Sequence, residues 1–233
     1  MLRIRAFRAP DDQEACEKFA IGHKKVLEDI GVKVTSGTND WISDPYVYVM
    51  VVEDTEKGNE ILGGVRLHVA NRETVLPMVE AISKVENKIF NEIDKLIDGG
   101  TAEICGIWNS RSIMGLGLGA IYLMRSSIAL ASQIGLDTIL SFASRATRQR
   151  GYEKGFEPFT VVGNKGEFNY PKLDLIATAV ICYDPLELRL ASEKERVEIS
   201  KLRDRLKFIA TETWPKGEFE LEYDLKLDSI KEI

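Results

Sequence analysis

Residues 112–124, SIMGLGLGAIYLM, place glycines at the alternate positions 115, 117 and 119 directly before a long apolar run. A glycine inside a helix costs about 1 kcal/mol relative to alanine, so three of them mark a turn that precedes a helix. The apolar run predicts a helix from about residue 116 to 133, and Gly135 is typical of its end. Strand-like segments, TAEICGIW and LDTILSFAS, flank it. Because a helical crossover joins parallel strands, residues 103–108 and 137–143 are predicted to be parallel neighbours.

The glycine loop, residues 115–119, has the composition of an anion-binding turn. The first N–H groups of a helix have no partner within the helix, and glycine lets phosphate oxygens approach the backbone closely. Two familiar phosphate loops do not match. No lysine follows the glycines, as a Walker A loop requires, and the spacing G-x-G-x-G differs from the dinucleotide fingerprint G-x-G-x-x-G.

The rest of the chain predicts further strands and helices. Alternating or β-branched segments predict strands at residues 2–7, 46–54, 60–70, 159–163, 173–184 and 217–228, the last at a sheet edge with one wet face. Helical spacing predicts helices at residues 10–31, 75–98 and 185–210, with a short helix or turn at 145–155. Asp11 and Glu14 resemble a capping box at the first helix, and residues 32–45 are turn-rich.

Size and composition limit the possible functions. The 233 residues, 44% of them hydrophobic, suit one catalytic domain at residues 1–184 with an extension at 185–233, a helix and edge strand packed on the same domain. The net charge of −6 argues against a broad nucleic-acid surface. The sequence has no signal peptide and no apolar run long enough to span a membrane, and its three cysteines are widely spaced. These features predict a cytoplasmic protein, and two histidines make a metal centre improbable.

Residues 103–156 resemble the GNAT superfamily of acyl-CoA transferases. Their loop is Q/R-x-x-G-x-G/A; Gly117 and Gly119 take its glycine positions, Met114 takes the Q/R position, and Arg111 lies close enough to supply the charge. The stretch RGYEKGF is similar to the family's YEKLGF, and the order of elements from residue 2 to 184 is the family's order. The resemblance implies an α/β (α+β) fold whose mixed, mostly antiparallel sheet is flanked by helices. It also implies that strands 103–108 and 137–143 splay at their C-terminal ends.

The same resemblance implies a cofactor, acetyl-CoA or a longer acyl-CoA, and no metal. The residues expected to bind it are Ile107, Trp108, Arg111, Met114, Gly115, Gly117, Leu118, Gly119 and Ala120. A narrower resemblance, carried by YVYVMVVED and GGVRL, is to acyl-homoserine-lactone synthases and N-acyl amino acid synthases, which take acyl chains from acyl carrier protein. Arg66 matches their strand arginine and Glu103 matches the glutamate of their Glu-x-x-Arg motif, whereas Gly106 replaces the motif's arginine.

Acyl transfer to an amine needs a base for the ammonium proton, a donor for the developing oxyanion and an acid for the leaving thiolate. Glu103 is the candidate base, because it is a carboxylate in an apolar strand, and Tyr152 is the candidate acid. The backbone N–H of Ile107 or Trp108 would bind the carbonyl, and Arg66 would hold a substrate carboxylate. The alternatives are that Glu103 faces solvent or caps a neighbouring element, that Tyr152 packs on a helix, that Trp108 is a core residue, and that Arg66 pairs with an acid across strands.

The sequence therefore predicts an N-acyltransferase that moves an acyl group, acetyl being expected, from acyl-CoA to the amine of a small molecule or peptide by direct transfer. One alternative is a carrier-protein-dependent N-acyl amino acid or homoserine-lactone-type synthase, which a wide apolar channel would favour. Another is a non-catalytic ligand-binding or sensor protein, which a blocked gap between the two parallel strands would favour. No nucleic acid and no membrane span are expected, and a homodimer is left open.

Overall fold

The computed structural model describes residues 1–29, 31, 39–145, 147–170, 175–214 and 217–231. Within these residues one sheet has the strand order β6-β8-β5-β4-β3-β2-β1-β10-β9, and β7 pairs with β8. The strands are β1 (Leu2–Arg8), β2 (Val47–Asp54), β3 (Glu60–Val69), β4 (Thr101–Asn109), β5 (Thr138–Ser144), β6 (Glu157–Pro158), β7 (Glu167–Asn169), β8 (Ile176–Cys182), β9 (Lys207–Trp214) and β10 (Gly217–Asp224). The described pairings are antiparallel except β4 with β5 and β1 with β10.

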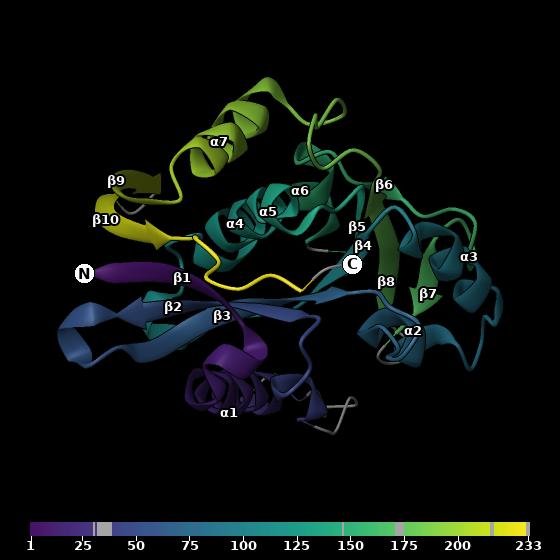
Figure 1. Cartoon of the computed structure of the whole chain (residues 1–233), viewed down its shortest axis with the longest axis horizontal. Coiled ribbons are helices and arrows are strands. Elements are labelled where there is room, and N and C mark those ends of the chain that lie inside the picture. The colour runs from purple at the N-terminus through teal and green to yellow at the C-terminus, as the bar shows by residue number, and fades with distance from the viewer. Residues whose placement is uncertain (30, 32–38, 146, 171–174, 215–216, 232–233) are drawn as a thin grey trace.

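Helices cover both faces of the sheet (Figure 1). Below the sheet in that view lies α1 (Gln13–Asp29), and α2 (Pro77–Ile82) and α3 (Lys88–Ile97) lie at the end that carries β8. Above it lie α4 (Met124–Ala129), α5 (Ala131–Ile134), α6 (Arg148–Glu153) and α7 (Glu193–Asp204). The expected helix after the glycine loop is present: it starts with a π-helical turn at residues 118–123 and continues as α4 and α5 to Gly135, which is left-handed.

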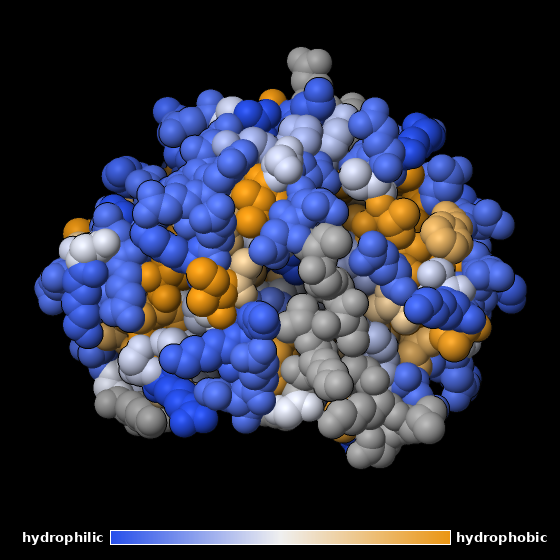
Figure 2. Space-filling view, turned by 90° about the horizontal axis from the view of Figure 1, so that it is seen from below, coloured by the Kyte–Doolittle hydropathy of each residue, from blue (hydrophilic) through white to orange (hydrophobic). Residues whose placement is uncertain are grey.

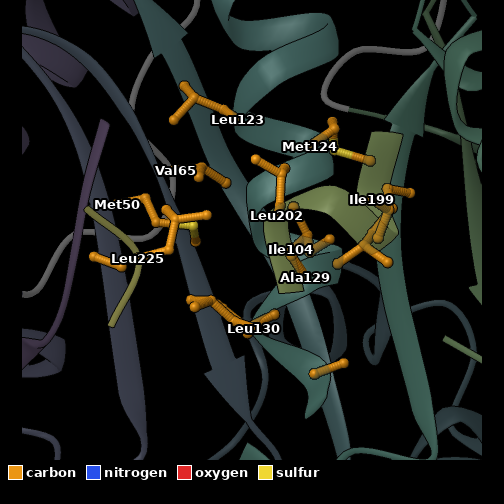
Figure 3. Packing of buried hydrophobic residues seen from close by; sticks show 14 of the residues in the cluster. Met50, Val65, Ile104, Leu123, Met124, Ala129, Leu130, Ile199, Leu202 and Leu225 are labelled. Carbon is orange, nitrogen blue, oxygen red and sulfur yellow. The ribbon is translucent and has the colours of Figure 1, made fainter. Parts of the chain in front are cut away.

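Three apolar clusters hold these layers together. The largest lies between the sheet and α4, α5 and α7. Figure 3 shows its members from the sheet and from the helices side by side: Met50, Val65, Ile104, Leu123, Met124, Ala129, Leu130, Ile199, Leu202 and Leu225. A second joins α2 and α3 to β5 and β8, and a third joins α1 to β2. The sheet that carries β4 and β5 is therefore packed on both faces.

The α/β architecture with a mostly antiparallel sheet is confirmed, and so is the parallel pairing of β4 with β5. Two predicted helices are wrong in extent. The helix expected at 75–98 breaks into α2 and α3, because Val85, counted on its apolar stripe, lies in the turn between them and is 78% exposed. The helix expected at 185–210 spans only α7, and residues from Lys207 onward form β9, whose Phe208 stacks on Tyr223 of β10.

Three smaller predictions are also wrong. Residues 159–163 form a turn rather than a strand, and β8 pairs instead with β6 and β7. The last strand, β10, lies between β1 and β9 and not at the edge. The first helix is capped one residue later than expected, because Asp12 accepts from the N–H of Ala15 at 3.0 Å while Asp11 pairs with Arg8. Of the expected loop at 32–45, residues 32–38 lie outside the described residues.

The C-terminal extension is tied to the rest of the chain by polar contacts as well as by the sheet. The side chain of Gln133 donates to the carbonyl of Leu225 at 2.8 Å and accepts from the N–H of Leu227 at 3.1 Å. On α7, Glu195 forms two hydrogen bonds of 2.8 Å with Arg125 of α4 and lies 3.6 Å from Lys154. The side chains of this trio are less than a tenth exposed, so the extension is anchored through a buried ionic contact.

Candidate active site

Strands β4 and β5 separate to form a fork. Their pairing ends at Ile104 and Ser141, although β4 continues to Asn109 and β5 to Ser144. At the branch point the hydroxyl of Ser141 donates to the carbonyl of Ile104 at 3.0 Å. On the other side of β4 the register with β3 shifts between Gly64 and Arg66, and Gly106 adopts a φ of +62°, which glycine tolerates. The β4–β5 fork confirms the predicted splay.

A cavity of about 830 Å³ occupies the β4–β5 fork. Its walls come from α1, β3, α2, β4, β5, α6 and the start of the π-helical turn. Apolar side chains from the cores on both sides of the sheet line it, among them Val26, Met78, Ile104, Phe142, Phe156 and Val180. Figure 2 looks at the α1 side of the molecule, where exposed apolar atoms form separate small patches between hydrophilic ones. Because its lining residues come from both faces of the sheet, the cavity passes between β4 and β5 and leaves the fork unblocked.

Glu103 lines this cavity and is 2% exposed. One of its carboxyl oxygens accepts the N–H of Met78, in the first turn of α2, at 2.8 Å, so Glu103 does not face solvent but contacts the start of a neighbouring helix, as one alternative expected. Burial raises the pKa of Glu103 to about 8, and the cation of Arg66 opposes that rise only in part. The carboxyl group therefore exchanges a proton near neutral pH, as a general base should. Its cross-strand neighbour is His68, whose pKa burial lowers.

Arg66 lines the same cavity from β3 and is 8% exposed. Its cross-strand neighbours are Val49 and Cys105, so the alternative of an acidic cross-strand partner is wrong. The guanidinium lies 4.6 Å from the centre of the Trp41 ring. Within the described residues its Nε has no hydrogen-bond partner and no salt bridge reaches it. A buried cation without a counter-charge is costly, so this position is suited to an anionic group of a ligand.

His23 of α1 and Trp108 of β4 line the cavity on its α1 side. The ring of Trp108 packs edge-on against Phe19 at 5.8 Å, and a Cβ on Gly22 would lie 2.1 Å from that ring, so glycine is needed there. Burial lowers the pKa of His23 to about 4, which keeps its imidazole neutral at physiological pH. Trp108 is thus a core side chain of the α1 layer, and only its backbone remains a candidate for binding a carbonyl.

The structure brings together six of the predicted site residues. Those that line the cavity are Arg66, Glu103, Ile107, Trp108, Gly119 and Ala120. The others do not line it. Tyr152 is half-buried against the large core cluster, and its neighbour Gly151 takes the lining position, so its role as an acid gains no support. Arg111 forms a 3.1 Å ion pair with Asp29 at the end of α1, and Met114 is 63% exposed.

The glycine loop itself faces the cavity only at its end. Gly115, Gly117 and Leu118 do not line the cavity, and Gly117 has a φ of +73°. A Cβ on Gly117 would lie 2.8 Å from the ring of Trp214, on β9. In the amide orientation that satisfies both of its polar atoms, Asn109 donates to the carbonyl of Trp108 at 2.9 Å and accepts the N–H of Gly119 at 3.0 Å.

Several lining residues escaped the sequence analysis. Ser141 stabilises the branch point, Asn109 holds the glycine loop, and Lys84 lines the cavity from the turn after α2. A serine inside the apolar run LDTILSFAS was the one available signal, because an isolated hydroxyl in a buried strand needs a partner. The others lie far apart in sequence, and only the folded chain brings them together.

No protein-family model matches the chain, and no curated protein matches it in sequence. Solved structures match most of it. FeeM, an N-acyl amino acid synthase from uncultured soil microbes, has a TM-score of 0.62 at 13% identity over 84% of this chain and 98% of FeeM. BjaI, a CoA-dependent acyl-homoserine lactone synthase, has 0.51 at 14% identity over 88% and 90%. ElaA of Escherichia coli has 0.53 at 10% identity over 78% and 99%.

The chain has the GNAT acyltransferase fold. At these identities the match concerns the GNAT architecture and not particular side chains. Two further findings bear on the site. No helix among the described residues is long and apolar enough to cross a membrane. In the same part of the chain, no group of three or more histidine, cysteine, aspartate or glutamate side chains is arranged to hold a metal ion.

Proposed function

We propose that the protein is an N-acyltransferase that moves an acyl group from a thioester donor to the amine of a small acceptor carrying a carboxylate. One observation carries the proposal: Arg66, a buried cation that forms no salt bridge among the described residues, and Glu103, a buried carboxyl group with a pKa of about 8, line one cavity at the β4–β5 fork. Arg66 would bind the acceptor carboxylate, which places the acceptor amine within reach of Glu103.

The pKa of Glu103 suits it to take a proton from an amine. The α-amino group of a peptide has an ordinary pKa of about 8, and that of a free amino acid lies higher because of its own carboxylate, so transfer of its proton to Glu103 is only modestly uphill. The neutral amine then attacks the thioester carbon, a C–N bond forms, and the carbonyl oxygen becomes negative. We place that oxygen on the backbone N–H of Ile107 or Trp108, where β4 no longer pairs with β5.

The C–S bond then breaks, the donor leaves as a thiolate, and that thiolate takes the remaining extra proton of the attacking nitrogen, directly or through water. A thiol has an ordinary pKa of about 8.5, so a thiolate leaves near neutral pH with little help from an acid. This chemistry makes a protein acid unnecessary at this step, which agrees with the position of Tyr152 away from the cavity. The protein's own thiols are poor acyl acceptors, because burial raises the pKa of Cys105, which lines the cavity, to about 12. Direct transfer therefore fits best.

The size of the cavity favours an acyl group longer than acetyl. Ligand pockets commonly measure about 300 to 1,000 Å³, and this one, at about 830 Å³, lies near the upper end of that range. Ile104, Met124, Phe156 and Val180 form an apolar wall toward the large core, which suits a hydrocarbon chain. An acetyl group would leave most of this wall without contact, so we replace the expected acetyl group by a longer chain.

The donor is a CoA thioester or an acyl carrier protein. BjaI is described as CoA-dependent, and FeeM as an N-acyl amino acid synthase, which supports an amino acid or a close derivative as acceptor. The open β4–β5 fork argues against a non-catalytic relic, for which a blocked gap would be expected. Cytoplasmic location, self-association and a domain boundary near residue 184 remain predictions.

The experiment that tests the function is a matrix of donors and acceptors. Acyl-CoA donors from acetyl to dodecanoyl are incubated with amino acids and with the corresponding amino acid amides, and the product is identified by mass spectrometry. We expect product with long-chain donors and free carboxylates, and strongly reduced product with amides. Arg66→Gln should remove the preference for the carboxylate. Equal turnover of amino acids and amides by the wild type would contradict the assigned role of Arg66.

A further inference from the structure

The C-terminal extension reaches the glycine loop. Besides the close approach of Trp214 to Gly117, the hydroxyl of Tyr122 donates to the carbonyl of Thr213 on β9 at 3.1 Å, and its ring packs edge-on against Phe219 of β10 at 5.9 Å. Residues about 100 positions later in the chain therefore cover the start of the π-helical turn. The Trp214 ring fits against Gly117 because this residue has no side chain.

The cavity and the covered half of the glycine loop are separate. The cavity touches the loop at Gly119 and Ala120 and not at residues 115–118. The N–H of Gly119 is engaged by Asn109. An anion that rested on this loop would need free amides and a clear approach to them. The ring at Gly117 and the amide side chain at Gly119 restrict both.

Strand β9, which carries Trp214 over the glycine loop, is fixed in place on both sides. It belongs to the sheet through β10, and the helix before it, α7, is locked to α4 by the buried pair of Glu195 and Arg125. The strand that carries Trp214 therefore does not move away from the loop at small cost, because that would separate β9 from β10 or break the buried pair and leave uncompensated charge.

We propose that Trp214 is a specificity-determining residue: it keeps the diphosphate of a nucleotide donor off the glycine loop, so that the enzyme recognises its donor by the acyl chain and the pantetheine arm alone. This rests on the proposed acyltransferase function. The arm enters the β4–β5 fork past Ala120 and the acyl chain fills the apolar cavity. The nucleotide of a CoA thioester then contributes little, in contrast to the sequence-based expectation that residues 115–120 cradle it.

The test compares two donors with the same acyl chain, acyl-CoA and S-acyl-pantetheine, which lacks the nucleotide. In the wild type we expect the values of kcat/KM for the two donors to lie within about tenfold of each other. A tenfold ratio corresponds to less binding free energy than one charge-assisted hydrogen bond contributes. Trp214→Ala should raise the preference for acyl-CoA about tenfold or more, because the loop amides become accessible. Ile209→Ala, on the exposed face of the same strand, is the matched control and should leave the ratio unchanged.

Calorimetric binding of CoA and of pantetheine to the same proteins supplies a second readout that does not need turnover. Trp214→Leu, which keeps an apolar side chain, covers the case in which the alanine variant does not fold. A wild-type preference for CoA above about a hundredfold, or equal ratios in the Trp214 and Ile209 variants, would overturn the proposal. The two proposals can fail separately. If no donor is turned over, but CoA and pantetheine bind the wild type with similar affinity and Trp214→Ala favours CoA, the acyltransferase function is contradicted and the role of Trp214 is supported. Absence of binding of both ligands would overturn the role of Trp214.

Discussion

Replacing Glu103 by glutamine should make the protein more stable at alkaline pH while making it less active. The unfolded chain releases the Glu103 proton near the ordinary pKa of 4.5, whereas the buried carboxyl group holds it until about pH 8. Between these values the folded protein binds more protons than the unfolded chain, so its stability falls as the pH rises through that window. Glutamine cannot ionise, and its side-chain oxygen can still accept the N–H of Met78.

The magnitude follows from the width of the window. Each unit of pKa difference corresponds to about 1.4 kcal/mol, so the wild type should lose up to about 5 kcal/mol relative to the variant between pH 4.5 and 8. Water that enters the cavity solvates the carboxylate and lowers this figure, so we expect a measured difference of about 2–5 kcal/mol. Above pH 8 the difference should level off, because the carboxyl group is then ionised in both states.

The assay is urea unfolding at pH 5, 7 and 9 for the wild type, Glu103→Gln and a control, Glu220→Gln, whose carboxylate is exposed on β10. The control should follow the wild type at each pH. In the acyl-transfer assay Glu103→Gln should be about 10²- to 10⁴-fold slower, the usual contribution of a positioned acid–base group. If the stability of Glu103→Gln follows that of the wild type at all three pH values, Glu103 is not a buried carboxyl group of raised pKa. Wild-type turnover by the variant would remove it as the base.

Three further predictions concern other buried titratable side chains, Arg66, His23 and Glu195. Arg66→Gln should raise KM for an amino acid acceptor about 10- to 100-fold through loss of a charge-assisted hydrogen bond, and an unchanged KM would exclude that contact. His23 has a pKa of about 4 in the folded protein and of about 6.5 in the unfolded chain. As the pH falls from 6.5 to 4, the wild type should therefore lose about 1–3 kcal/mol more unfolding free energy than His23→Gln. Equal losses for the two proteins in urea unfolding would refute this. Glu195→Ala should cost about 3–5 kcal/mol of unfolding free energy, because it leaves Arg125 and Lys154 buried without a counter-charge; a loss below 1 kcal/mol would show that water already reaches them.

The sequence predicted the elements that local pattern governs. The hairpin β2–β3, the parallel pair β4–β5 and the helix between them follow from alternation, β-branched residues and the glycines before an apolar run. It failed where tertiary contacts decide. Residues from Lys207 onward continue a charged, helix-like pattern, and they form a strand because Phe208 and its alternate neighbours find β10 beside them.

The site was predictable in part for the same reason. Glu103 could be found because a carboxylate within an apolar strand is unusual, and Arg66 because its segment resembles a known one. That Arg66 has no acidic cross-strand neighbour among the described residues depends on strand register, and the packing of Trp214 against Gly117 depends on a residue about 100 positions away. Neither feature can be predicted from the residues next to Arg66 or Gly117 in the sequence.

The parallel pairing of β1 with β10 has a consequence for biosynthesis. Leu2 lies opposite Leu221, so β1, once synthesised, must wait for a strand far along the chain before this edge is covered. An unpaired strand edge is a template for aggregation, and contacts this distant in sequence form slowly. Arg3 and Arg5 of β1 pair with the buried Glu53 of β2, and charged side chains on an uncovered strand disfavour its pairing with other chains. A ribosome that stalls before residue 217 would release a chain in which β4 and β5 have been synthesised but β1 still has an edge open to other chains.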